Sequence, residues 1–177
     1  MIALMTRDAD FCPSSDGLAP LSLQRLLERF PQGVRARFPV DKSQLERLSE
    51  NSVSLLEPLA VTLDFDGKSR LSLSFEASLG VDCMRCLKPL EKAMTLSPGI
   101  ELFERAADAD QAMLTDPNLD AVSSEDQRSL LELIEDEILL ELGHGLTHAD
   151  CRPEFHHETG RLSPFQDLAK LMAMKKP

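Results

Sequence analysis

The chain has 177 residues, of which 42% are hydrophobic and 28% charged, a balance typical of a globular protein. It contains no run near the roughly 20 apolar residues that a membrane-spanning helix needs. Its formal net charge is −11, and residues 101–145, with two basic and thirteen acidic side chains, account for all of it. Because phosphate binding depends on Lys and Arg, this balance lowers the expectation of direct nucleic-acid contact.

The N-terminal quarter predicts short elements. Residues 1–20 are punctuated by Pro and Gly, which indicates an irregular segment. Ser22 is a good N-cap, and the apolar residues behind it have helical spacing, so a short amphipathic helix is expected. Residues 33–40 alternate apolar and polar side chains, as a half-buried strand does. Asp41 followed by Gln44 is a capping-box pattern that predicts a second short helix.

The clearest β pattern lies in the middle of the chain. Alternating apolar side chains over residues 59–65 and 71–83 predict two antiparallel strands. Asp66 and Gly67 between them suit the positive φ of a tight hairpin turn. The long second strand ends at Cys83, and its parity places that side chain on the core side.

Two further features complete the expected sheet. Gly80 marks a bend or bulge in the long strand. Residues 93–103 form a further extended segment, which would return antiparallel after a turn formed by Cys83 to Cys86. The sequence therefore predicts an antiparallel β-meander.

The acidic part of the chain is expected to be a loop followed by a helix. Residues 104–123 are polar and have no regular period, which predicts a long loop. Ser124 and Gln127 would open the strongest amphipathic helix, and Gly143 would end it. The outward face of this helix carries carboxylates that are either solvated or dock a basic partner. They are Glu132, Glu135, Asp136, Glu137 and Glu141.

The remaining residues, 153–177, predict a polar linker and a C-terminal helix. Its apolar stripe includes Phe165, Leu168 and Leu171, which could pack on the same domain or bind a partner. The expected fold class is therefore α+β: an antiparallel β-meander packed with a long acidic amphipathic helix, short N-terminal helices and a C-terminal helix. The core domain would span residues 21–152.

Two pairs of soft metal ligands share one spacing. Cys83 and Cys86 stand at the end of the longest predicted strand, and His148 and Cys151 follow the strongest predicted helix. Zinc favours four thiolate and imidazole ligands in a tetrahedron, so these four residues predict a closed, structural zinc site. The plainer alternative is a pair of buried thiols and a surface histidine, and other histidines, His144 among them, could substitute as ligands.

Redox and enzymatic alternatives have less support. A reactive C-x-x-C usually lies at the N-terminus of a helix, whereas Pro89 and the β-like continuation after Cys86 argue against a helix there. The sequence contains no nucleophile triad, Walker loop or Gly-rich dinucleotide turn, so no enzyme is expected. Asp8 and Asp10 stand where an export signal would be basic. Four cysteines without such a signal predict a reducing, cytoplasmic location with no membrane association.

Four motifs in order resemble the YceD family of bacteria. They are Val81 to Leu87, Ser129 to Leu142, His148 to Cys151, and Ser163 to Leu171. The resemblance covers roughly residues 20–177. It implies a non-enzymatic factor in large ribosomal subunit biogenesis that supports accumulation of 23S ribosomal RNA. Many members outside the proteobacterial branch carry a second C-x-x-C where this chain has only His148 and Cys151.

The partners implied by the resemblance are ribosomal proteins or rRNA-processing factors of the large subunit. The acidic segment 101–141 could attract basic partners by electrostatic steering, and direct rRNA contact stays open. Two alternatives remain: a thiol–disulfide or metal-handling protein that uses Cys83 and Cys86, and a general acidic chaperone or adaptor.

Overall fold

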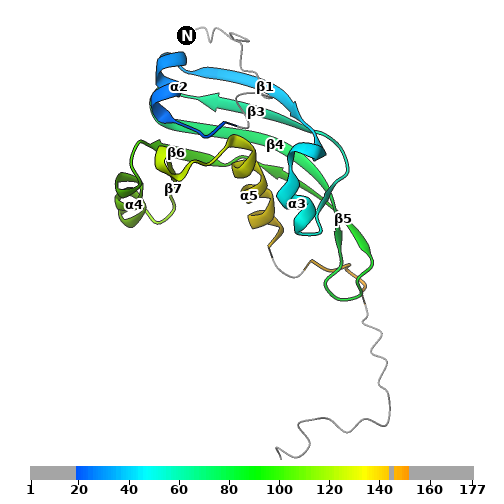
Figure 1. Cartoon of the computed structure of the whole chain (residues 1–177). Coiled ribbons are helices and arrows are strands. Elements are labelled where there is room, and N and C mark those ends of the chain that lie inside the picture. Colours follow the sequence, from blue (N-terminus) through cyan, green and yellow to red (C-terminus); the bar gives the residue numbers. More distant parts are fainter. Residues whose placement is uncertain (1–18, 144–145, 152–177) are drawn as a thin grey trace, which may run out of the picture.

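The computed structural model describes residues 19–143 and 146–151, which form a mixed α+β fold with a seven-stranded sheet (Figure 1). Strands β1, β3, β4, β6 and β7 are neighbours in that order, while β2 and β5 also pair with β4. The strands are β1 (Val34–Val40), β2 (Ser54–Leu55), β3 (Leu59–Phe65), β4 (Arg70–Asp82), β5 (Pro89–Leu96), β6 (Gly99–Phe103) and β7 (Asp120–Ser123).

Four α-helices and two short 3-10 turns complete the described part of the chain. Helices α3 and α5 lie against the same face of the sheet (Figure 1). None of these helices is both long and apolar enough to span a membrane. The helices are α2 (Leu23–Arg29), α3 (Glu46–Glu50), α4 (Ala106–Thr115) and α5 (Leu130–Leu142), and the turns are η1 (Lys42–Gln44) and η2 (Ser124–Asp126).

The core lies between this helical layer and the sheet. In β1, β3 and β4 the apolar residues of one parity are buried, whereas most side chains of the other parity are partly or fully exposed. Leu130, Ile134 and Ile138 of α5 are completely buried against this surface. Each such side chain contributes about 1.5–3 kcal/mol when it leaves water, so α5 is fixed mainly by its apolar face.

The predictions for residues 22–67 are largely confirmed. The hydroxyl of Ser22 accepts a hydrogen bond from the Arg25 amide, and α2 begins at the next residue. The capping box predicted at Asp41 is present, although it opens the turn η1 just ahead of α3. In the β3–β4 hairpin, Gly67 has a φ of 76°. The Asp66 carboxylate accepts hydrogen bonds from the backbone amides of residues 68–70.

The predicted loop over residues 104–123 is wrong, because α4 and β7 lie within it. Helix α4 buries only Ala109, so its sequence shows almost no apolar period. It acts as the crossover between β6 and β7, which pair in parallel, and parallel neighbours need such a connection. The sheet is therefore not a simple antiparallel meander: β3, β4 and β5 follow one another as predicted, but β6 pairs with β4.

The predicted start of the main helix is also wrong. Ser124 belongs to η2, and its hydroxyl accepts a hydrogen bond from the Leu23 amide and donates one to the Phe103 carbonyl. Helix α5 begins six residues later, after Ser129, whose hydroxyl accepts from the Glu132 amide at 3.2 Å. The Glu132 carboxylate accepts from the Ser129 amide at 2.7 Å, so the capping box is reciprocal.

Gly80 has a different role from the predicted bend or bulge. The β4–β5 ladder continues through it in unbroken register, from Phe75 opposite Leu96 to Asp82 opposite Pro89. A Cβ atom at Gly80 would lie 2.6 Å from the hydroxyl oxygen of Ser54 in β2. The glycine therefore lets β2 approach β4 closely, and that hydroxyl donates a hydrogen bond to the Gly80 carbonyl.

Candidate metal centre

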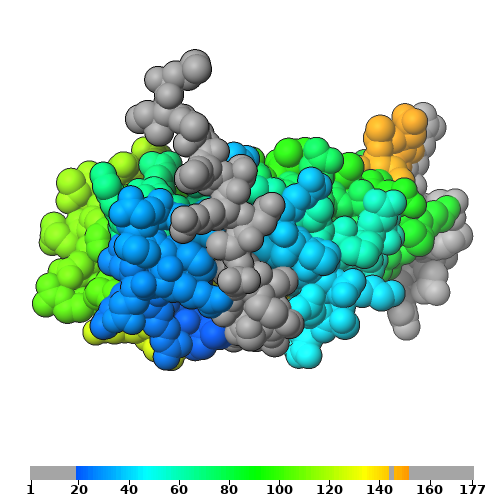
Figure 2. All heavy atoms as spheres, turned by 90° about the horizontal axis from the view of Figure 1, so that it is seen from above, coloured from blue at the N-terminus to red at the C-terminus, as the bar shows by residue number. Residues whose placement is uncertain are grey.

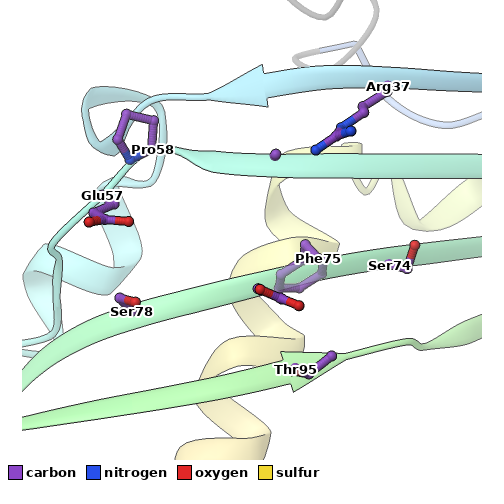
Figure 3. A pocket seen from close by; sticks show the side chains of 9 residues that line it. Arg37, Glu57, Pro58, Ser74, Phe75, Ser78 and Thr95 are labelled. Atoms are coloured by element: carbon purple, nitrogen blue, oxygen red, sulfur yellow. The ribbon is translucent and has the colours of Figure 1, made fainter.

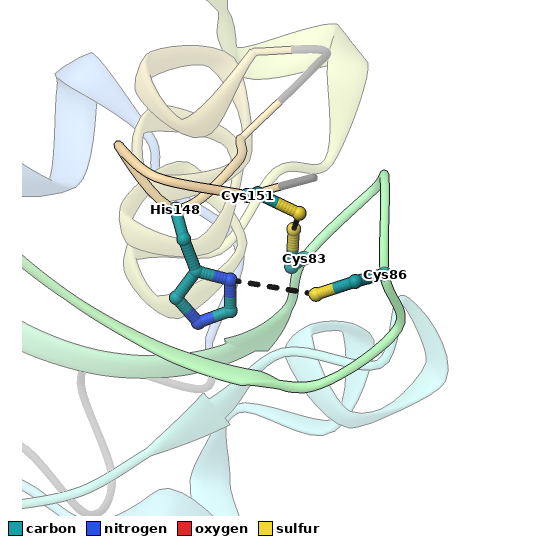
Figure 4. A group of neighbouring side chains, drawn as sticks. All are labelled: Cys83, Cys86, His148 and Cys151. Atoms are coloured by element: carbon teal, nitrogen blue, oxygen red, sulfur yellow. Dashed lines mark hydrogen bonds between the residues drawn. The ribbon is translucent and has the colours of Figure 1, made fainter. Parts of the chain in front are cut away.

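The turn between β4 and β5 carries the first ligand pair (Figure 4). Its backbone is fixed by two hydrogen bonds of 2.9 Å, from the Cys83 amide to the Lys88 carbonyl and from the Leu87 amide to the Cys83 carbonyl. Cys83 is fully buried and Cys86 half-buried. The turn therefore brings both sulfurs of the pair to one side of the hairpin tip.

The second ligand pair lies in residues 146–151, which dock on this tip. The Met84 amide donates to the Leu146 carbonyl at 2.9 Å, and the Arg85 guanidinium donates to the Cys151 carbonyl at 2.9 Å. Figure 2 shows residues 146–151, in orange, beside the β4–β5 hairpin at one end of the molecule. The predicted meeting of the sheet tip with the segment after the main helix is thus confirmed.

The four ligand atoms lie close enough together to hold one metal ion. All lie within 4.8 Å of one another. Two sulfurs about 2.3 Å from one zinc ion would be about 3.8 Å apart, and a sulfur and an imidazole nitrogen about 3.6 Å. The Cys83 and Cys151 sulfurs are 3.7 Å apart, and the Cys86 sulfur lies 3.6 Å from His148 Nδ1. A disulfide would need about 2.05 Å, so the thiols are free.

The second nitrogen of the histidine is also in the position that a zinc ligand requires. His148 Nε2 lies 3.0 Å from the Pro89 carbonyl oxygen, an acceptor that can take only an N–H. This contact places the proton on Nε2 and leaves the lone pair of Nδ1 directed at the sulfurs. A metal-bound histidine usually makes such a contact with its other ring nitrogen, and it fixes the ring orientation.

The electrostatics of the tip favour a thiolate at Cys83. Burial acts to raise the pKa of this thiol, but hydrogen bonds from the amides of Cys86, Arg85 and His148 lower it to about 5. Hydrogen bonding to the Cys83 sulfur, and then to Pro89, raises the pKa of His148. Burial, followed by hydrogen bonds to the other two sulfurs, raises the pKa of Cys151 to about 11. Zinc would therefore displace a proton from Cys151 on binding.

These donors fit zinc better than a harder cation. Three thiolates and one imidazole are soft or borderline ligands, whereas Mg²⁺ and Ca²⁺ take oxygen. Four protein ligands fill a tetrahedral shell and leave no position for water or substrate, which is the pattern of a structural site. The cluster can therefore hold two segments together, and it offers no open metal position for catalysis.

Comparisons of the chain with protein-family models, curated proteins and solved structures gave no match. The chemistry of the donor set and its geometry are therefore the main guides to what this end of the molecule does.

The acidic face of α5 differs from the prediction in its exposure. Glu135 is 97% buried, and its carboxylate accepts a hydrogen bond from the Leu48 amide at 3.3 Å, while burial raises its pKa. Asp136 forms ion pairs with Arg47, at 2.6 Å, and with Arg128. Most of these carboxylates are therefore used inside the protein.

The other predicted partner-binding residues have mixed outcomes. Glu132 belongs to the capping box of α5, Glu137 is half-buried, and Glu141 is exposed. Leu140, on the same helix, is 75% exposed. The apolar stripe of the C-terminal helix, with Phe165, Leu168 and Leu171, lies outside the described residues, as does most of the segment predicted to be irregular.

A hollow of about 440 Å³ lies on the sheet face that α5 does not cover (Figure 3). Arg37, Glu57 and Ser74 are among its lining residues, and all three are exposed. Arg37 lies on the exposed face of β1. The polar side chains around the hollow are partly or fully exposed, so it has no built ligand site, in contrast to the cysteine cluster.

Proposed function

We propose that this chain is a non-enzymatic factor in large ribosomal subunit biogenesis, which supports accumulation of 23S rRNA through contacts with ribosomal proteins or rRNA-processing factors. We further propose that its tip is held by a structural zinc ion bound to Cys83, Cys86, His148 and Cys151. The chain would act in the cytoplasm, and it would provide contact surfaces while catalysing no reaction.

The observation that best supports the proposed zinc clamp is the spacing of the four donors. The distances of 3.7 and 3.6 Å match the two kinds of edge in a tetrahedral site, and the donors come from segments more than 60 residues apart in the chain. A closed site of this kind stabilises a shape. A rigid shape with exposed contact surfaces suits an assembly factor better than a catalyst.

The ribosomal part of the proposal is supported by the resemblance of four ordered motifs to the YceD family. Two of those motifs, Val81 to Leu87 and His148 to Cys151, supply all four proposed zinc ligands. A zinc clamp would give these two motifs a physical task. That agreement connects the zinc clamp with the proposed cellular role.

The test of the ribosomal role is a sedimentation profile of cells that lack the protein. We expect a selective deficit of large subunits and of 23S rRNA, restored by the wild-type gene. A gene with Cys83→Ser and Cys86→Ser should restore them poorly at equal protein level, because the tip would lose its metal. Normal subunit ratios in the deletion strain would contradict the ribosomal role.

A second candidate, a thiol–disulfide or metal-handling protein, is favoured by one observation. The Cys83 and Cys151 sulfurs are 3.7 Å apart, so a small movement would allow a disulfide bond. Alkylation of the native chain distinguishes the two functions. Fast modification of Cys83 at neutral pH, unchanged by a chelator, favours thiol chemistry. Protection that is lost on adding a chelator favours the zinc clamp.

A further inference from the structure

Two large apolar side chains project into solvent at the tip of the β4–β5 hairpin. Met84 is 67% exposed and Leu87 is 77% exposed. They alternate with Arg85 and Lys88, which are also exposed. Most large apolar residues of the described chain are buried in the core, so a pair of exposed ones on one short turn needs an explanation beyond stability.

The backbone conformation of Leu87 is a second sign that its exposed side chain has a function. Its φ is 58°, in the left-handed region that glycine adopts freely and that a branched side chain rarely adopts. The leucine therefore strains the turn, and its exposed side chain packs little in return. Folding alone would favour glycine at this position. A residue that opposes folding in two ways indicates a function for its side chain.

The tip is also held rigid, which favours binding. Cys83 and Cys86 bracket Met84 and Arg85, and the docked segment 146–151 fixes the turn from the other side. The Met84 amide and the Arg85 guanidinium each donate a hydrogen bond to that segment. A side chain presented on a fixed turn loses little conformational entropy when a partner binds it.

Resting on the proposed function, we infer that the tip formed by Met84, Arg85, Leu87 and Lys88 is a docking surface for a protein of the precursor large subunit. The partner site would be an apolar pocket with carboxylates at its rim. The two apolar side chains would enter the pocket, and the two cations would pair with the rim.

The chemistry of the tip favours protein over RNA. Met and Arg are enriched at protein interfaces, and an apolar anchor in a pocket is a common hot spot. Single-stranded RNA is bound largely by stacking of its bases on aromatic rings or guanidinium planes. Residues 82–92 contain no aromatic side chain, so the tip offers no ring on which a base could stack.

The test compares binding of the purified zinc-loaded chain to precursor large subunits isolated from cells that lack the protein. Leu87→Gly should weaken co-sedimentation at least tenfold while melting temperature and zinc content stay the same or rise. Met84→Ser should weaken it similarly. Leu114→Ser is the matched control, because Leu114 is 79% exposed on α4, far from the tip, and its loss should leave binding unchanged (Figure 1).

A photoreactive group at position 84 identifies what the tip touches. We expect a cross-linked product that resists ribonuclease and is digested by protease. A cross-link to rRNA, or equal binding by wild type and Leu87→Gly, would overturn the docking surface while leaving the ribosomal role intact. If the wild-type chain binds no precursor particle, the proposed function itself fails.

Discussion

Removal of the metal should release residues 146–151 from the hairpin tip without unfolding the domain. Apart from the two contacts among the ligand atoms themselves, three hydrogen bonds join these residues to the tip, and at about 0.5–1.5 kcal/mol net each they supply roughly 1.5–4.5 kcal/mol. Ordering six residues costs at least about 6 kcal/mol. The hydrogen bonds and the partial burial of Leu146 against the core are therefore close to or below this cost, so the metal decides whether the segment stays docked.

Hydrogen exchange measures this release directly. In the zinc-loaded chain the amides of Met84 and Cys151, which donate to Leu146 and His148, should be protected. A chelator, or the variant Cys86→Ser, should abolish that protection, whereas amides of β3 should stay protected because the main core cluster contains none of the four ligands. Metal analysis should give one zinc per chain.

Matched controls separate the clamp from general effects of thiol loss. Cys12→Ser lies outside the ligand set and should keep both the zinc and the protection. If the metal-free chain protects Met84 and Cys151 as well as the loaded chain does, hydrogen bonding alone suffices and the reasoning is wrong. The same conclusion follows if the wild-type chain purifies under reducing conditions without zinc and cannot take it up.

Three further predictions concern the body of the domain, and urea unfolding tests each. Burial raises the pKa of Glu135 above its unfolded value near 4.5. The contribution of this carboxyl to stability is therefore complete below pH 4.5 and is lost as pH rises through the higher folded pKa. The unfolding free energy of the wild type minus that of Glu135→Gln should accordingly grow as pH falls from 7 to 4.5. A flat difference would show that burial does not perturb this carboxyl. Asp136→Asn breaks two half-exposed ion pairs and should lower the unfolding free energy by about 1 kcal/mol. Asp64→Asn breaks one longer and more exposed pair and should lower it by less than about 0.5 kcal/mol. Equal losses in the two variants would contradict this ranking of the ion pairs. Ser129→Ala removes the N-cap of α5 and should cost about 0.5–2 kcal/mol.

The sequence was a good guide wherever a local pattern decided the structure. Strict alternation over residues 59–65 and 71–83 predicted two strands and the side of the sheet on which Cys83 lies, because the period of a strand leaves one choice of face. The equal spacing of the two ligand pairs predicted that they meet. Although more than 60 residues separate the two pairs in the sequence, the shared ligand chemistry was enough to predict their contact.

The predictions that failed depended on distant contacts. Ser124 and Ser129 are equally good caps, and only the contacts of the Ser124 hydroxyl with Leu23 and Phe103 assign it to another task. Glu135 looked like a surface residue of α5. It is buried because the Leu48 amide, in the first turn of α3, has no partner within its own helix and takes one from 87 residues away. The hydrophobic patterns of α3 and α5 do not reveal that the Leu48 amide and the Glu135 carboxylate form a hydrogen bond.

Strand β4 divides the sheet into a body and an arm. Its first part, to residue 74, has β3 on one side and β6 on the other, at Arg70 to Ser72. Beyond Phe75 it has β5 on one side, and on the other only two residues of β2, opposite Leu79 and Gly80. Whatever the cysteine turn binds is therefore connected to the body of the sheet mainly through the β4–β5 ladder.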